Sequence, residues 1–331
     1  MLVKFFRKDT LEVLIIFALL LLALWIKTLM GLGDQDIERT LSYGTPLELV
    51  INQFALHLPG LSTIVAFLIT LVVLFMMQSL NNQFIFVPQR SLLPSLLYVM
   101  IGFSFISLQH LTPALAAMPI IILSLKSIFT SYRKDYAEAD YFLAGFYMAL
   151  AAVVYLPALA YLLTIIFSVL IMRPFSWREW VATFAGLLVP FIFLATYYLL
   201  FDTDGMNTIL ALDPGKIIAA IPKSMNSFFG YGFLGTILLA LAAASFFILT
   251  WTGSQKVRTN KIFLVFFSMI VVGILSYVLI PTVSKEALVI MALPLSYVIS
   301  VYMIFSRRTL IPDALLLMLL SLAVLLQIFV E

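Results

Sequence analysis

Residues 141–172 read YFLAGFYMALAAVVYLPALAYLLTIIFSVLIM, residues 173–180 read RPFSWREW, and residues 181–202 read VATFAGLLVPFIFLATYYLLFD. As one continuous helix the first run would be about 48 Å long, whereas the apolar core of a bilayer is about 30 Å thick. This run is therefore too long for one upright span and barely long enough for two. Pro157 lies near its middle and disfavours helix in the residues just before it.

Basic residues flank this run on both sides. Arg133 and Lys134 precede it, and Arg173 and Arg178 follow it. Because Lys and Arg concentrate in the cytoplasmic loops of membrane proteins, both clusters are expected on the same side. The chain between them must then cross the membrane an even number of times. The sequence predicts a pair of short helices over 141–172, either crossing fully or re-entrant, that turns near Tyr155–Pro157.

The composition of the whole chain is that of a membrane protein. Hydrophobic residues make up 63% and charged residues 11%, and the mean hydropathy is +1.14, far from an ordinary soluble domain. We predict one all-α integral membrane domain over residues 1–331, a polytopic transmembrane bundle of about eleven spans. The expected spans lie near residues 13–30, 62–80, 92–108, 111–129, 141–155, 157–172, 180–201, 229–251, 262–281, 287–305 and 310–330.

The distribution of positive charge predicts the orientation of these spans. Lys4, Arg7 and Lys8 precede the first apolar run, which has no signal-peptidase-like site after it, so we expect a retained span with the N-terminus in the cytoplasm. With this orientation, most Lys and Arg outside the spans fall on the cytoplasmic side. The outer segments carry only Arg39, Lys216, Lys223 and Lys285. The expected location is the cytoplasmic (inner) membrane of a bacterium.

Two outer segments, 31–61 and 202–228, are long enough to hold short interfacial helices. In the first, Thr45, Pro46 and Glu48 form a helix start signal. An amphipathic helix from Thr45 to Leu58 is expected to lie along the membrane surface, although a simple linker is an equally good interpretation. Its predicted apolar face consists of Leu47, Val50, Ile51, Phe54, Ala55 and Leu58. In the second segment, Asp213-Pro214 starts another short helix.

Few ionisable side chains in or next to the spans could take part in proton transfer or metal binding. His110 follows Gln109 at the outer turn between two spans, where a histidine can carry a proton or bind a metal. His57, the only other histidine, is not at ligand spacing, and the chain has no cysteine, so no metal site is expected. Asp313 follows a proline at the start of the last span, where helix capping is the simple interpretation and a proton relay the alternative.

Several function classes have no support in the sequence. There is no GxxxxGK[ST], HExxH or GxSxG motif, which argues against ATP-driven work, zinc-peptidase chemistry and a serine-hydrolase elbow. The net charge of +3 is modest and scattered over short loops, so nucleic acid is not an expected partner. No cofactor is expected, membrane lipids are the expected partners, and the oligomeric state stays open.

Residues 80–202, and RPFSWREW in particular, resemble a family of bacterial multi-pass inner-membrane proteins of uncharacterised activity. More distantly, the layout resembles the GT-C glycosyltransferases, in which an acidic residue follows the first span and interfacial helices fill the first outer loop. The resemblance implies Asp34 or Asp36 as the acidic residue, although this chain lacks the soluble C-terminal domain that many of those enzymes carry.

Three functions remain open at this point. The first is a transferase that uses a polyprenyl-phosphate-linked sugar at the outer face. In it, Asp34 or Asp36 would be the general base, and Arg39, Lys216 and Lys223 would neutralise the lipid phosphate. The second is a non-catalytic subunit that scaffolds an envelope assembly. The third is a lipid or small-solute transporter, which the scarcity of polar residues in mid-span disfavours.

Overall fold

The structure, a computed structural model, describes residues 2–7, 10–31, 45–85, 87, 91–132, 134–172, 177–201, 228–251, 257–279, 285–306 and 310–329. Every regular element in these ranges is helical, which confirms the all-α prediction. In chain order the elements are α1 (Leu2–Phe6), α2 (Leu11–Leu29), α3 (Pro46–His57), α4 (Pro59–Phe84), α5 (Leu93–Gly102), η1 (Ile106–Leu108), α6 (Pro113–Thr130), α7 (Glu138–Val154), η2 (Leu156–Tyr161), α8 (Leu162–Met172), α9 (Trp177–Phe201), α12 (Phe228–Trp251), α13 (Val257–Leu279), α14 (Ala287–Phe305) and α15 (Leu310–Phe329).

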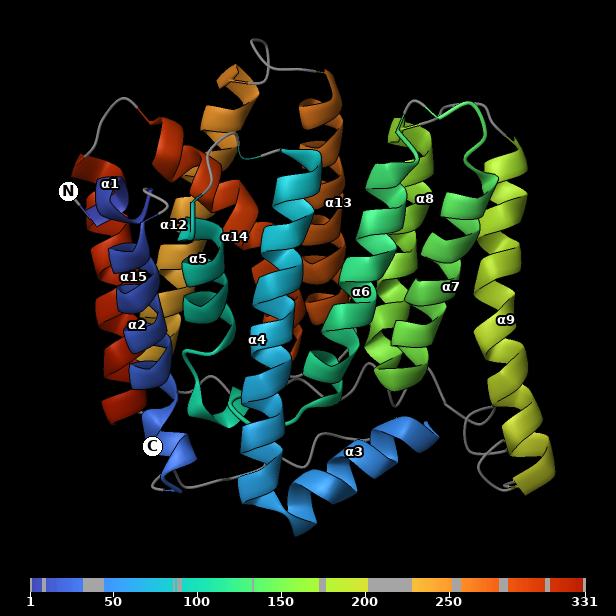
Figure 1. The fold of residues 1–331 in the computed structure, drawn as a ribbon, viewed down its shortest axis with the longest axis horizontal. Helices are drawn as coiled ribbons and strands as arrows, with labels where there is room; N and C mark the ends of the chain where they lie inside the picture. Colours follow the sequence, from blue (N-terminus) through green and yellow to red (C-terminus); the bar gives the residue numbers. More distant parts are fainter. Residues whose placement is uncertain are drawn as a thin grey trace.

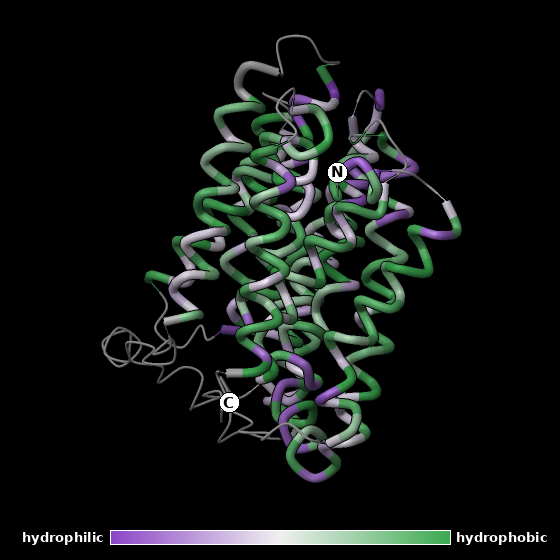
Figure 2. Tube along the Cα trace, turned by 90° about the vertical axis from the view of Figure 1, so that its left-hand side faces the viewer, coloured by the Kyte–Doolittle hydropathy of each residue, from purple (hydrophilic) through white to green (hydrophobic). Residues whose placement is uncertain are grey.

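The chain is a multi-pass membrane protein. Eight of the described helices, α2, α4, α6, α9, α12, α13, α14 and α15, are long and apolar enough to cross a bilayer, with mean hydropathies between 1.7 and 2.7. They stand side by side as a bundle, whereas α3 lies across one end of it (Figure 1). Hydrophobic residues fill the middle of the bundle, and hydrophilic residues gather toward its two ends (Figure 2). This banding matches the apolar core and polar surfaces of a bilayer.

The predicted pair of short helices over 141–172 is present. Helix α7 ends at Val154, and Tyr155 is extended, with φ −139° and ψ 100°. The chain then turns through η2 and returns as α8, antiparallel to α7 (Figure 1). Pro157 lacks the backbone N–H that would continue a helix from α7, so the turn forms where the sequence predicts it.

The predicted span over 92–108 is wrong in its length. Helix α5 has only ten residues, and irregular chain and the single turn η1 follow it. Every residue of α5 from Leu93 to Gly102 is buried by protein. Because α5 is surrounded by other helices and not by lipid, its length does not have to match the bilayer, and irregular backbone after it is tolerated.

Helix α14 forms the centre of the bundle. All of its residues from Ala287 to Ile304 are buried. The hydroxyls of Ser296 and Ser300 donate to carbonyl oxygens three residues earlier, so these side chains bring no unsatisfied donor into the core. The hydroxyl of Tyr297 donates to the carbonyl oxygen of Met77 on α4 (2.7 Å), and its ring stacks on Phe266 of α13 (5.2 Å between centroids).

The N-terminal helix α1 is attached to the start of α15. The backbone N–H of Val3 donates to Oδ1 of Asp313 (2.8 Å), and the hydroxyl of Ser91 donates to the carbonyl oxygen of Phe6 (2.9 Å). The side chains of Val3 and Phe6 are buried. A structural role therefore accounts for the carboxylate of Asp313, which joins two helices that lie far apart in the sequence.

Candidate functional site

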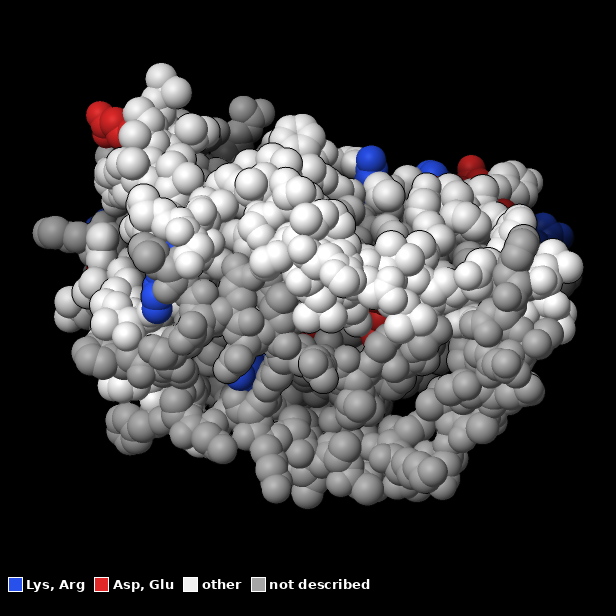
Figure 3. All heavy atoms as spheres, turned by 90° about the horizontal axis from the view of Figure 1, so that it is seen from below, with Lys and Arg blue, Asp and Glu red and all other residues white. Residues whose placement is uncertain are grey.

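The sequence predicts the functional site at the end of the bundle where α2 finishes, where α3 lies and where η1 leads into α6 (Figure 1). We call this the α3 end. The predicted catalytic residues Asp34 and Asp36, and the predicted phosphate ligands Arg39, Lys216 and Lys223, lie outside the described residues. Of the predicted site residues, the structure describes His110. Seen from this end, the described surface is largely uncharged, with isolated acidic and basic side chains (Figure 3).

Gln109, which precedes His110, is a fully buried structural residue. Its side-chain N–H groups donate to the carbonyl oxygens of Leu24 (3.0 Å) and Phe103 (2.9 Å), and its Oε1 accepts a hydrogen bond from the hydroxyl of Thr28. These bonds use both amide hydrogens and tie the irregular chain after α5 to the last turns of α2. Gln109 therefore positions the turn that carries His110.

His110 is partly buried in this turn, which is fixed on its C-terminal side. The N–H of Leu111 donates to the hydroxyl of Ser62 (2.9 Å), and Thr112 caps α6 by accepting from the N–H of Leu115 (3.1 Å). Burial lowers the pKa of His110 to about 4, against a smaller upward effect of a hydrogen bond with the backbone of Ser107. At neutral pH the imidazole is therefore uncharged, and burial makes it a weaker base than an ordinary histidine.

The helix predicted from Thr45 to Leu58 is present as α3, Pro46–His57. The hydroxyl of Thr45 accepts a hydrogen bond from the N–H of Glu48 (3.3 Å), and Pro46 occupies the first helical position. This is the start signal that the sequence contains, with the geometry that such caps adopt.

The face that α3 turns toward the bundle differs from the prediction. Ile51, Phe54 and Ala55 contact the bundle as expected, but Val50 is 61% exposed. Glu48 is only 2% exposed, and its Oε2 accepts a hydrogen bond from the hydroxyl of Thr45 (3.4 Å). The sequence pattern assigned Glu48 only to the helix cap. The structure shows that it is also a buried carboxylate at the α3 end. Two further members of the predicted apolar face, Leu47 and Leu58, are exposed.

A groove of about 320 Å³ opens between α2, α5 and α15. Its lining is apolar except for Lys27 and Gln327, both near the C-terminal ends of their helices. The ammonium of Lys27 donates to the carbonyl oxygen of Gln327 (2.9 Å), and the side-chain amide of Gln327 donates to the carbonyl oxygen of Leu24 (3.0 Å). In the sequence, Lys27 lies close to the end of the predicted span 13–30. The groove depends on α15, which lies far away in the sequence.

A second groove, of about 180 Å³, lies between α12, α13 and α14 and is lined by apolar residues and Tyr277. His110 does not line either groove. Within the ranges that the structure describes, no three His, Cys, Asp or Glu side chains lie close enough together to hold a metal ion.

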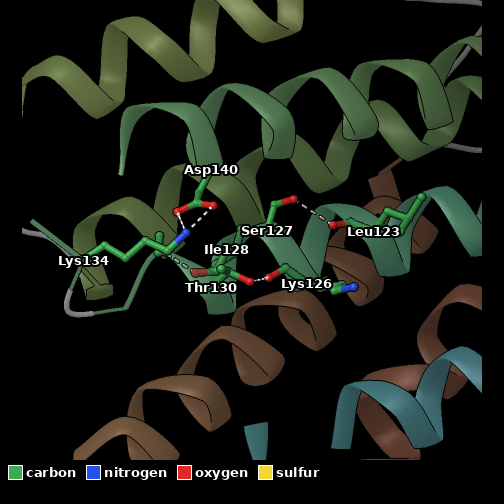
Figure 4. A network of polar contacts seen from close by, with 8 residues as sticks. Leu123, Lys126, Ser127, Ile128, Thr130, Lys134 and Asp140 are labelled. Atoms are coloured by element: carbon green, nitrogen blue, oxygen red, sulfur yellow. Dashed lines mark hydrogen bonds and ion pairs between the residues drawn. The ribbon is translucent and has the colours of Figure 1, made fainter. Parts of the chain in front are cut away.

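The opposite end of the bundle carries basic residues in structural contacts. Lys134 forms an ion pair with Asp140 at the start of α7 (2.7 Å), next to the last turns of α6 (Figure 4). Lys261 donates to the carbonyl oxygen of Met172 at the end of α8 (3.0 Å), where a cation is favoured by the helix dipole. These contacts hold helix ends together.

Comparison of the chain with protein-family models, with characterised proteins and with solved structures finds no match. The structure itself supports a multi-pass integral membrane protein. Any finer function has to be inferred from its residues and their arrangement.

Proposed function

We propose that the protein is a transferase of the bacterial cytoplasmic membrane that moves a sugar or similar group from a polyprenyl-phosphate carrier at the α3 end. One observation carries the proposal: α2 ends at Leu29, directly before the segment with Asp34 and Asp36, at the end of the bundle that also holds α3 and His110. A carboxylate just after the end of an apolar span meets a lipid-borne substrate at headgroup depth.

The proposed topology has eleven passages, with the N-terminus in the cytoplasm and the α3 end outside. Successive helices alternate in direction through the bundle in Figure 1, including the short α5, α7 and α8. The end with the N-terminus holds Lys4 and Arg7, Lys134, Arg178 and Lys261, in agreement with the enrichment of positive charge on the cytoplasmic side.

The proposed reaction needs one base and a set of cations. Asp34 or Asp36 removes the proton of the acceptor hydroxyl while its oxygen bonds to the sugar carbon, and the bond from that carbon to the carrier phosphate breaks. The carrier leaves as a phosphate anion, which Arg39, Lys216 and Lys223 stabilise. The resulting carboxylic acid releases its proton to water, since burial makes the neutral His110 a poor proton acceptor.

A second candidate is a non-catalytic subunit that scaffolds an envelope assembly. The packing of α14, which is buried on all sides, and the largely apolar lining of both grooves favour this alternative. Such a protein would need no acidic residue at position 34 or 36.

Conservative substitutions separate the two functions. Asp34→Asn and Asp36→Asn keep the size and polarity of the side chain but remove the base, so at least one should abolish activity while protein level and insertion stay unchanged. Activity is measured as rescue of a deletion strain, with its lipid-linked sugars and envelope glycans compared by mass spectrometry. Asp135→Asn, an exposed acid at the opposite end of the bundle, is the matched control. Full rescue by both variants and by the double variant would exclude the transferase and leave the scaffold.

A further inference from the structure

The groove between α2, α5 and α15 is lined by residues of all three helices. One wall is a single face of α2, with Leu20, Ala23, Leu24 and Lys27 at helical spacing. The opposite wall repeats this spacing on α15 with Leu320, Ala323, Val324 and Gln327. The fully buried Leu96 and Met100 of α5 form its floor. The small, exposed side chain of Ala23 leaves space between the walls.

Polar groups gather at one end of this groove. The ammonium of Lys27 donates a hydrogen bond to the carbonyl oxygen of Gln327. The side-chain amide of Gln327 in turn donates a hydrogen bond to the carbonyl oxygen of Leu24 on α2. Gln327 is 8% exposed. Both residues are in the last turn or two of their helices, so the ammonium is held where the apolar spans end, at headgroup depth.

Charge complementarity selects the occupant. The apolar length of the groove suits a hydrocarbon chain, and the fixed ammonium suits an anionic group at the level of the headgroups. A helix from another protein would cover Lys27 with apolar side chains and remove its charge from water, which is unfavourable. A polar solute from water would find hydrogen-bonding groups at one end only.

We propose that this groove binds one anionic phospholipid from the leaflet at the α3 end. The phosphate contacts the ammonium of Lys27, and one acyl chain lies along Ala23 and Val324. The site does not depend on transferase activity, and it would serve either candidate function by fixing α2 against α15 through the lipid.

The charge is tested first, with purified full-length protein in mixed micelles that contain equal amounts of phosphatidylglycerol and phosphatidylcholine. Native mass spectrometry counts the lipids retained. The wild type should retain one phosphatidylglycerol, and Lys27→Met, which keeps the apolar stem, should lower its retention about fivefold. Lys126→Met is the matched control, because Lys126 also lies near the end of an apolar helix but away from the groove. Equal retention of the two lipids by the wild type, or no effect of Lys27→Met, would overturn the proposal.

The binding site for the acyl chain is tested by filling the groove with a larger side chain. Ala23→Trp should remove bound phosphatidylglycerol, whereas Ala18→Trp, on an exposed face of α2 outside the groove, should not. Ala23 is itself exposed, so the larger side chain does not have to enter the core. The same spectra report the oligomeric state. A wild-type dimer that Ala23→Trp converts to a monomer would assign the groove to a second copy of the chain and contradict the lipid site, as would unchanged retention by Ala23→Trp.

Discussion

The backbone carbonyl oxygen of Phe142 on α7 lies so close to Gly186 on α9 that a methyl group at position 186 would overlap it. The contact is reciprocal, because Gly145 on α7 faces the carbonyl oxygen of Thr183 on α9 in the same way. Two helices whose backbones approach this closely gain dispersion contacts along their length, which is how small residues associate helices in membranes.

Adding a methyl group to this crossing should destabilise the protein. Gly186→Ala and Gly145→Ala each force α7 and α9 apart, at about 1–3 kcal/mol. Thermal unfolding in detergent should show a lower midpoint for both variants. Gly235→Ala on α12, where nothing lies within 4 Å of the added carbon, is the control and should be neutral or slightly stabilising. Equal midpoints for all three variants would show that α7 and α9 do not touch at these glycines.

A charge on the inner face of α3 should release this helix from the bundle. Ala55 is 2% exposed, so Ala55→Asp buries a carboxylate and should reduce stability or expression strongly. Gln53→Asp, on the exposed face of the same helix, should have little effect. Limited proteolysis of membranes, followed by blotting, measures whether α3 becomes accessible. If both variants resist the protease equally, α3 does not depend on its contacts with the bundle.

The stability of the protein should fall in mildly acidic solution because of His110. Its pKa is lowered to about 4 in the folded chain, from 6.5 for an ordinary histidine. Between these values the unfolded chain binds a proton that the folded chain does not, so stability rises with pH. The stability that the lowered pKa of His110 contributes is fully present above about pH 6.5 and is lost as the pH falls toward 4. The difference in unfolding midpoint between pH 7 and pH 5 should therefore be smaller for His110→Gln than for the wild type. An unchanged difference would mean that His110 titrates normally.

Single cysteines can test the topology cleanly because the natural chain has none. Cysteine at Tyr136 or Trp177, both highly exposed at the ends of α7 and α9, should react with an impermeant maleimide from the same side of the membrane. Cysteine at Gln53 on α3 should react from the other side. Labelling of positions 136 and 177 from opposite sides would rule out an even number of crossings between them.

Local signals in the sequence predict those parts of the fold that depend on a few neighbouring residues. Thr45 and Pro46 start α3, and Pro157 ends the first helix of the short pair, because a cap or a missing N–H acts within one turn. The short length of α5 could not be predicted in this way. Its apolar residues look the same whether lipid or protein surrounds them, and only the tertiary packing distinguishes the two.

The same distinction between local signals and tertiary packing applies to the candidate site. The sequence singled out His110 as a polar residue at a turn, and the structure places it at the α3 end. The groove at Lys27 could not be found, because half of it belongs to α15. The roles of Asp34 and Asp36 stay predictions, since both residues lie outside the described ranges.

The burial of α14 on all sides has a consequence for biosynthesis. Helix α5 is too short to span a bilayer, and it is covered partly by α14, which the ribosome makes almost two hundred residues later. During that interval the face of α5 that packs against α14, including Gly102 opposite Ala292, is not yet covered. A chain that stops before residue 287 can insert most of its helices into the membrane. It lacks α14, so these helices cannot pack around the centre of the bundle. Such truncated products should be degraded by membrane proteases more rapidly than chains that lack only α15.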